Sequence, residues 1–418
     1  MKSYIIEGGK RLVGETYVSG SKNASLPIIA ASILNGGITK LYNVPNIHDT
    51  QKMLEILKEL GCKIKRNSGK IIIDSKNIKK WEIPEKLMRQ MRSSVIIAGA
   101  LIARFRKATF SYPGGCDIGS RPIDLHLKAF EKIGINIKEE SGFIHCQSEK
   151  MKPGEIQLEF PSVGATENSM LAAVFTEGET IIKNAAMEPE IVDLQRFLNR
   201  MGAKISGAGT NVIKVHGVKR LKDVSYKIMP DRIEAGTLLC MCAATGGKIE
   251  LKNVASDHLT PVLHKLIETG CKIDIKNNSI ALEAPKKLKA VDIKTMPYPG
   301  FPTDMQSIFA TMLCTAKGTS IITENIFENR YKYMSELKRM GAKITIEGKT
   351  AVIKGGKKLN NATVRSTDLR GGAALVLAGL IAKGKTNVEN IEYILRGYEN
   401  LDKKLNDLGA KVILKEGE

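Results

Sequence analysis

The chain has 418 residues, of which 43% are hydrophobic and 26% charged, and its formal net charge is +20. At roughly 100–200 residues per domain this length predicts two to four domains, and the apolar fraction excludes an intrinsically disordered chain. The longest apolar stretches, Ser94–Ala103 and Ala373–Ala382, are well short of the roughly 20 residues that a membrane-spanning helix requires, so we expect them in the core.

The positive charge can indicate nucleic acid, an anionic membrane surface or small anionic substrates as partners. The lysines are scattered, however, and only 5% of the residues are aromatic, which leaves little material for a base-stacking surface. We therefore expect a solvated lysine-rich surface, with no nucleic acid and no membrane as partner. The N-terminal residues show no signal peptide and the seven cysteines form no CxxC pair, which favours a reducing, cytoplasmic location.

One short pattern recurs along the whole chain: an amphipathic segment, a glycine and then a β-branched strand. The glycines stand 68 to 73 residues apart, at Gly61, Gly134, Gly202, Gly270, Gly341 and Gly409. Such regularity predicts six copies of one unit. We expect each glycine to end a helix, because a glycine adopts the left-handed conformation there without steric cost.

A second pattern keeps the same spacing, and it consists of an apolar helix, a polar turn and a β-branched strand. A helix that is apolar all round is buried. After each glycine, two alternating runs such as residues 62–74 and 342–355 predict a β-hairpin. Each unit is therefore expected to be strand, buried helix, strand, outer helix and hairpin. In chain order, the buried helix and its following strand are expected within 26–44, 94–112, 170–185, 238–254, 308–326 and 373–391.

The sixth unit stops one hairpin strand short. Residues 5–12 (IIEGGKRL) parallel residues 352–359 (VIKGGKKL), so the start of the chain is expected to complete the last unit. If the units divide three and three, a first domain spans 22–229, and a second combines 1–21 with 230–418. The chain then crosses between the domains twice, and ligands favour clefts between domains.

Cations stand at the predicted starts of four buried helices. They are Lys22, Arg92, Arg232 and Arg370, and they lie beside Ser, Thr or Asp residues that are ordinary N-caps. A cation at a helix N-terminus is unfavourable, because the helix dipole is positive there. A shared anionic ligand would offset that cost, so these helix starts are candidates for an anion site.

A loop rich in glycine and proline, residues 111–126, interrupts the second unit. It contains Cys116, Arg121 and His126, and we expect a mobile lid with a reactive thiol, because nearby cations lower a thiol pKa. The histidine and cysteine spacing predicts no metal site, and the absence of phosphate-binding glycine motifs predicts no nucleotide cofactor. Other cysteines follow apolar patterns and are expected in the core: Cys62, Cys240, Cys242, Cys271 and Cys314.

Five motifs together resemble those of the UDP-N-acetylglucosamine 1-carboxyvinyltransferases, a family of enolpyruvyl transferases. They are residues 21–24 (SKNA), 113–122 (PGGCDIGSRP), 301–306 (FPTDMQ), 328–330 (ENR) and 396–399 (RGYE). The likeness extends over the full length, and the cysteine loop is highly specific to that family. It implies an α/β fold of two inside-out α/β barrel domains, built from six βαβαββ repeats with three in each domain.

The resemblance also implies an activity. The family transfers the enolpyruvyl group of phosphoenolpyruvate to the 3′-hydroxyl of UDP-N-acetylglucosamine through a tetrahedral intermediate, with release of phosphate, in the first committed step of peptidoglycan synthesis. It implies that Cys116 is the acid, which can also bond covalently to the pyruvyl carbon and is the family's target of fosfomycin. Asp304 is implied as the base. No cofactor is expected, and the protein is expected to be a monomer or a weak homo-oligomer.

The family motifs further imply which residues hold the substrates. Lys22, Arg121 and Arg396 would hold the phosphoenolpyruvate, with Asn23 nearby, and Lys22 and Arg396 count among the catalytic residues. Arg330, Asp368 and Arg370 match positions that line the same cleft. The UDP-sugar would be bound by Arg92, Arg121, Pro122, Ile123, Asp124, Leu125, Ser162, Val163, Gly164, Asp304 and Ile326.

Two alternatives stay open at this stage. One is an enolpyruvyl-shikimate-phosphate synthase-like transferase, which shares the six-unit fold but lacks the cysteine loop. The other is a basic protein that binds RNA or processes RNA ends, which predicts tight and strongly salt-dependent RNA binding.

Overall fold

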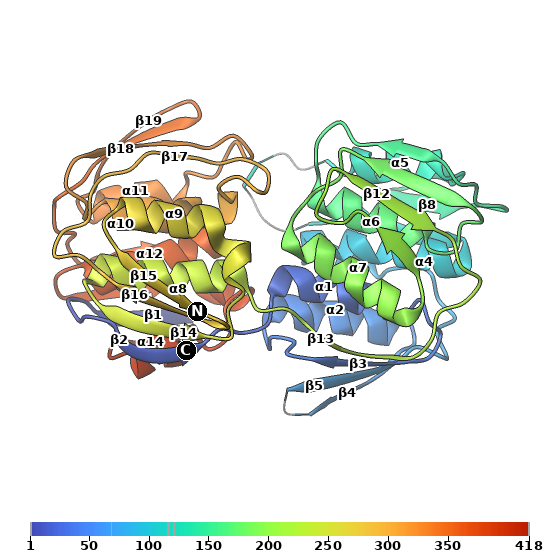
Figure 1. Ribbon diagram of the computed structural model, residues 1–418, viewed down its shortest axis with the longest axis horizontal. Coiled ribbons are helices and arrows are strands. Elements are labelled where there is room, and N and C mark those ends of the chain that lie inside the picture. Colours follow the sequence, from blue (N-terminus) through green and yellow to red (C-terminus); the bar gives the residue numbers. More distant parts are fainter. Residues whose placement is uncertain (1, 68, 115–117, 120–121, 417–418) are drawn as a thin grey trace. The chain divides into compact units, whose positions relative to one another are not determined.

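The computed structural model describes residues 2–67, 69–114, 118–119 and 122–416 (Figure 1). The described residues form two compact units. The first unit comprises 20–114 and 122–229, and the second comprises 2–19, 118–119 and 230–416. Cys116 and Arg121 lie outside the described residues.

The first unit begins with a buried helix and ends with a strand. It contains, in chain order, α1 (Lys22–Ala31), β3 (Ile38–Tyr42), α2 (His48–Glu59), β4 (Lys63–Asn67), β5 (Lys70–Asp74), α3 (Glu85–Met88), the 3-10 helix η1 (Arg92–Val95), α4 (Ile96–Phe105), β6 (Lys107–Ser111), α5 (Asp124–Lys132), β7 (Asn136–Glu140), β8 (Phe143–Gln147), β9 (Glu155–Gln157), α6 (Val163–Ala173), β10 (Glu179–Lys183), α7 (Pro189–Met201), β11 (Lys204–Ser206), β12 (Val212–His216) and β13 (Val224–Lys227).

The second unit combines both ends of the chain. It contains β1 (Ser3–Glu7), β2 (Val13–Tyr17), α8 (Arg232–Thr245), β14 (Lys248–Lys252), η2 (Ser256–Leu259), α9 (Thr260–Glu268), β15 (Lys272–Lys276), β16 (Ser279–Glu283), β17 (Ile293–Lys294), η3 (Thr303–Met305), α10 (Gln306–Leu313), β18 (Thr319–Thr323), α11 (Tyr333–Arg339), β19 (Lys343–Glu347), β20 (Thr350–Lys354), β21 (Thr363–Arg365), α12 (Leu369–Ile381), β22 (Lys385–Glu389), α13 (Glu392–Leu395), α14 (Leu401–Asp407) and β23 (Lys411–Lys415).

The predicted repeat is confirmed by the strand pairing. In the third, fifth and sixth copies, the strand after the buried helix pairs in parallel with the strand before that helix and antiparallel with a hairpin strand. The sheets have the orders β9-β10-β12-β11, β17-β18-β20-β19 and β21-β22-β1-β23. All six repeated glycines have positive φ, between 82° and 112°, as predicted for residues that end a helix.

The start of the chain completes the sixth copy, as predicted. Strand β1 lies between β22 and β23 and is antiparallel to both. The glycine at its end explains the likeness to the fifth copy: a Cβ at Gly8 would lie 2.2 Å from the Ala382 carbonyl oxygen, and one at Gly355 would lie 2.2 Å from the Ala316 oxygen. Both strands must therefore end in a residue without a side chain.

Two strands depart from the simple repeat, and both lie where the chain passes from one unit to the other. Strand β2 pairs in parallel with β14 of the second unit, and β13 pairs in parallel with β3 of the first. The two copies have therefore exchanged their first strands. Gly20 lies at one of these passages, and a Cβ there would lie 1.6 Å from the Asn43 carbonyl oxygen, so only glycine fits.

The second copy is also irregular. Its sheet has three strands in the order β6-β8-β7, and the place of the missing strand is taken by an isolated parallel bridge between Glu82 and Thr109. The loop predicted in this copy, residues 111–126, lies partly outside the described residues.

Within each unit the buried helices form the centre and the sheets lie outside them. In the first unit α1, α4 and α6 are buried along almost their whole length, and in the second α8, α10 and α12 pack against one another. This arrangement is the inside-out α/β barrel that the sequence implied. Six described cysteines are buried, including the five expected in the core. None of the helices in the described residues combines the length and apolar character needed to cross a bilayer.

Candidate active site

The buried helices begin with side chains that cap them. Ser21 accepts a hydrogen bond from the Ala24 N–H at the start of α1, and Ser162 accepts one from the Ala165 N–H at the start of α6. At α8 and α12 the caps are carboxylates, Asp231 and Asp368, and each accepts two N–H groups. Asp368, a predicted substrate-binding residue, thus has a structural role that explains its position.

In the first unit the cation at the start of α1 has a protein partner. Lys22 Nζ lies 3.1 Å from a carboxylate oxygen of Asp49, which is 2% exposed in the first turn of α2. This carboxylate offsets the repulsion between the lysine and the helix dipole. A shared ligand is therefore not required to explain this cation, in contrast to the argument from the sequence alone.

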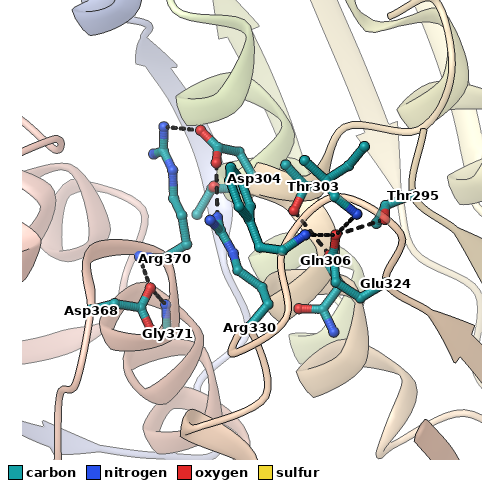
Figure 2. Close-up of polar contacts among 12 residues, drawn as sticks. Thr295, Thr303, Asp304, Gln306, Glu324, Arg330, Asp368, Arg370 and Gly371 are labelled. Carbon is teal, nitrogen blue, oxygen red and sulfur yellow. Dashed lines mark hydrogen bonds and ion pairs between the residues drawn. The ribbon is translucent and has the colours of Figure 1, made fainter. Parts of the chain in front are cut away.

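In the second unit Asp304 is held by two arginines. Arg330 Nη2 donates to Asp304 Oδ1 at 2.8 Å, and Arg370 Nη2 donates to Oδ2 at 3.0 Å (Figure 2). Both arginines are buried, whereas the Asp304 side chain is 27% exposed. Both oxygens of Asp304 are thereby fixed in orientation.

Both arginine side chains keep their positive charge despite their burial. Burial acts to lower the pKa of Arg330, but the neighbouring carboxylates, Asp304 foremost, outweigh it and raise that pKa. The pKa of Arg370 is raised as well, because its contacts with Tyr398 and Asp304 outweigh the effect of burial. The structure thus brings three of the predicted residues together in one ion-pair cluster.

Apart from Arg92, the predicted UDP-sugar residues that are described in the first unit lie at or just before the starts of two packed helices. Asp124 and Leu125 open α5, and Ser162–Gly164 open α6. Pro122 is exposed and Ile123 is buried just before α5. Free N–H groups at such helix starts favour anionic ligands.

His126, which the site prediction left out, joins these two helices. A Cβ at Gly164 would lie 3.1 Å from the His126 ring, which is tighter than most such contacts, so glycine favours this approach. The amide of Asn168 donates to the Val95 carbonyl oxygen and accepts the Gly99 N–H, and its nitrogen lies 2.8 Å from His126 Nδ1. Because these backbone contacts fix the amide orientation, Nδ1 is the acceptor and Nε2 carries the proton.

The remaining predicted residues are spread over several elements. Asn23 lies in α1, Arg92 opens η1, Arg396 follows α13, and the Ile326 N–H donates to Glu324. Cys116 and Arg121 cannot be placed, because they lie outside the described residues.

At the start of α8, Arg232 lies over the ring of Tyr298, 5.5 Å from its centre. In the same first turn, the buried Glu234 bonds to Lys404, and Lys404 Nζ also donates to Ser19 Oγ at 2.7 Å. Burial raises the pKa of Glu234 to about 7, although the charge of Lys404 acts in the opposite direction. Among the described residues, no group of three or more His, Cys, Asp or Glu side chains could hold a metal ion.

Sequence reasoning missed Glu324, a buried carboxylate beside Asp304 and Arg330 in Figure 2. Its segment was interpreted only as the β-branched strand of the fifth repeat. The sequence did contain one signal for a functional role of Glu324, which is its charge directly after a β-branched strand.

Comparison with known proteins defines the class. The EPSP synthase family model, described as 3-phosphoshikimate 1-carboxyvinyltransferase, matches residues 6–405. The fold is similar to that of the enolpyruvyl transferase NikO from Streptomyces tendae, with a TM-score of 0.91, 24% identity and coverage of 100% of this chain and 99% of that one. It is also similar to an EPSP synthase from Acinetobacter baumannii, with a TM-score of 0.78, 19% identity and coverage of 99% and 100%. These likenesses confirm the implied fold.

Sequence relatives narrow the class. The chain is 53% identical to UDP-N-acetylglucosamine 1-carboxyvinyltransferase 2 of Caldanaerobacter subterraneus subsp. tengcongensis, over 99% of both chains. It is 50% identical to the enzyme of the same name from Clostridium tetani, again over 99% of both. The chain therefore belongs to the family of UDP-N-acetylglucosamine 1-carboxyvinyltransferases.

Proposed function

We propose that this protein transfers the enolpyruvyl group of phosphoenolpyruvate to the 3′-hydroxyl of UDP-N-acetylglucosamine and releases phosphate. The observation that carries the proposal is the high identity, over the full length, to relatives named for this reaction. A bond forms between the sugar oxygen and C2 of phosphoenolpyruvate while C3 gains a proton. The C2–O bond to phosphate then breaks and C3 loses a proton, which restores the double bond.

The phosphoenolpyruvate is proposed to be held by Lys22, Arg121 and Arg396, with Asn23 beside Lys22. This ligand is strongly anionic near neutral pH, so its removal from water requires several cations. Lys22 at the start of α1 supports the assignment, because the helix dipole adds to its positive charge.

The UDP-sugar is proposed to be bound by Arg92, Asp304, Ile326 and two helix starts. The paired starts of α5 and α6 support this role, since their free N–H groups suit a diphosphate. The proposed UDP-sugar residues just before or at these helix starts are Pro122, Ile123, Asp124, Leu125, Ser162, Val163 and Gly164, and Arg121 is proposed to act with them. Arg330, Asp368 and Arg370 are proposed to line the same site.

Cys116 is proposed as the acid that protonates C3, and Asp304 as the base for the sugar hydroxyl. A carboxylate is a weak base for an alcohol, so we expect Asp304 to accept the proton late, as the C–O bond develops. Its fixation by Arg330 and Arg370 supports this role, because a base must be oriented before reaction.

The reaction places the protein in peptidoglycan synthesis, and we propose a cytoplasmic location, because both substrates are small anionic metabolites. We further propose a monomer or weak homo-oligomer that needs no cofactor and no nucleic-acid or membrane partner. The proposed domains are 22–229, and 1–21 with 230–418.

A phosphate-release assay tests the function. Purified protein should release phosphate from phosphoenolpyruvate when UDP-N-acetylglucosamine is present, and not when it is replaced by shikimate 3-phosphate. Release with shikimate 3-phosphate alone would instead support the synthase for which the family model is named.

A further inference from the structure

Glu324 is a buried carboxylate for which the proposed reaction has no use. It follows strand β18 and is 2% exposed. Its Oε1 accepts hydrogen bonds from Thr295 Oγ1 at 2.9 Å, from the Ile326 N–H at 2.8 Å and from the Phe327 N–H at 3.2 Å, and its Oε2 accepts one from Thr303 Oγ1 at 2.9 Å (Figure 2). Four donors on one carboxylate indicate that it is ionised and serves as an anchor.

The two oxygens anchor two different segments. Thr303 precedes Asp304 in the 3-10 helix η3, so Oε2 holds the turn that presents Asp304. Ile326 and Phe327 begin the segment that leads to Arg330, so Oε1 holds the loop that supplies the partner of Asp304.

The turn needs such an anchor. Helix η3 has only three residues, and a 3-10 helix this short is weakly held by its own hydrogen bonds. Besides its ion pairs, the position of Asp304 depends on neighbours that fix the backbone. A hydrogen bond from Thr303 to an ionised acceptor is roughly twice as strong as one to a neutral acceptor.

We propose that Glu324 is a positioning residue for enolpyruvyl transfer. Through Thr303 on one side and residues 326–330 on the other, it holds Asp304 and Arg330 in their mutual orientation without touching substrate. The inference rests on the proposed function for its catalytic consequence, whereas its structural consequence is independent of that function.

Threonine variants test the positioning role of Glu324 more sharply than Glu324→Ala does. That substitution would leave four hydrogen-bond donors without their acceptor and could prevent folding. Thr303→Val keeps the side-chain shape and removes one hydrogen bond to Glu324. Thr295→Val is the control: it removes a hydrogen bond to the same carboxylate from a residue outside η3, and with it the acceptor of the Asn325 N–H. Thr303→Ser should restore the contact.

In the phosphate-release assay, Thr303→Val should lower kcat about tenfold or more and leave the KM for UDP-N-acetylglucosamine within about twofold, because it disturbs only the orientation of a reacting group. Thr303→Ser should recover most of that loss. Thr295→Val should keep kcat within about twofold of the wild type, although both valine variants should lower the melting temperature.

An equal loss of kcat in both valine variants, or no rescue by serine, would show that Glu324 only stabilises the fold. Crystal structures of the variants provide a readout that does not depend on turnover. The 2.8 Å contact between Arg330 and Asp304 should be lost or lengthened in Thr303→Val and kept in Thr295→Val. An unchanged contact in Thr303→Val would overturn the proposal, whereas an inactive wild type would overturn the proposed function alone.

Discussion

The starts of α1 and α12 use the same arrangement in different units. In each, a side chain caps the helix, a cation follows within two residues, and a carboxylate from another element pairs with that cation. At α1 the pair is Lys22 with Asp49, and at α12 it is Arg370 with Asp304. The carboxylate lets a cation stand where the helix dipole opposes it.

The difference between the two starts lies in the carboxylates. Asp49 is buried, with 2% exposure, and serves as a counter-ion of Lys22. Asp304 is 27% exposed at its side chain and is also held by Arg330, so it is both accessible and oriented. The same arrangement therefore compensates charge at one helix start and can present a reactive carboxylate at the other.

The strongest test of this difference is Asp304→Asn. The substitution keeps the shape but removes the proposed base, so we expect kcat to fall by a factor of about 10²–10⁴. It also removes the carboxylate that pairs directly with two buried arginines, which should lower the free energy of unfolding by about 3–5 kcal/mol. Steady-state phosphate release and urea unfolding measure the two effects.

Retention of more than about a tenth of the wild-type kcat would remove Asp304 from the role of base. A folded variant with wild-type stability would show that the arginines find other partners. The two outcomes are independent, since one concerns turnover and the other concerns the ion pairs.

Sequence and structure agree best on features set by local chemistry. The six glycines, the capping residues and the parallel between residues 5–12 and 352–359 follow from backbone conformation and hydrogen bonding, which a sequence displays directly. The predicted domain bounds assign β2 to the second domain and β13 to the first, but the pairing of β2 with β14 and of β13 with β3 was not predicted, because parallel pairing leaves no local mark on either strand. The partners of the helix-start cations were missed for the same reason: Asp49 and Lys22 are 27 residues apart and meet only through packing.

Cys116→Ser changes neither the α1 start nor the α12 start, so it tests the proposed acid separately from the two carboxylates compared above. If the thiol is the acid, we expect kcat to fall at least about a hundredfold, because general acid catalysis contributes about that much. Affinity for UDP-N-acetylglucosamine, measured by calorimetry, should stay within about threefold, since the helix starts still offer their N–H groups. An equal loss of binding and turnover would show that Cys116 shapes the pocket.

A third helix start, at α8, gives a prediction for pH. Glu234 is buried and bonds to Lys404 and the Ser19 N–H, with Asp231 nearby. Burial raises its pKa from 4.5 to about 7 in the folded protein, so the folded state binds a proton that the unfolded state has already lost. The stabilisation from this proton is complete below the unfolded pKa and is lost as the pH rises through 7.

The free energy of unfolding should therefore fall between pH 5 and pH 7 by up to about 3 kcal/mol through this group, and Glu234→Gln should remove that part of the fall. Urea unfolding of both proteins at several pH values measures the difference. If the wild type gains stability over the variant as the pH rises, the attraction of Lys404 dominates over burial.

The smallest effect concerns the counter-ion itself. Asp49→Asn removes the carboxylate that pairs with Lys22 beside the α1 dipole, and we expect the free energy of unfolding to fall by about 1–3 kcal/mol. Inorganic phosphate should raise the melting temperature of this variant more than that of the wild type, because an anion at the helix start replaces the lost charge. If phosphate raises the melting temperature of both proteins equally, Asp49 does not compensate the charge of Lys22. The starts of α1 and α12 would then share their geometry but not the pairing of a cation with a compensating carboxylate.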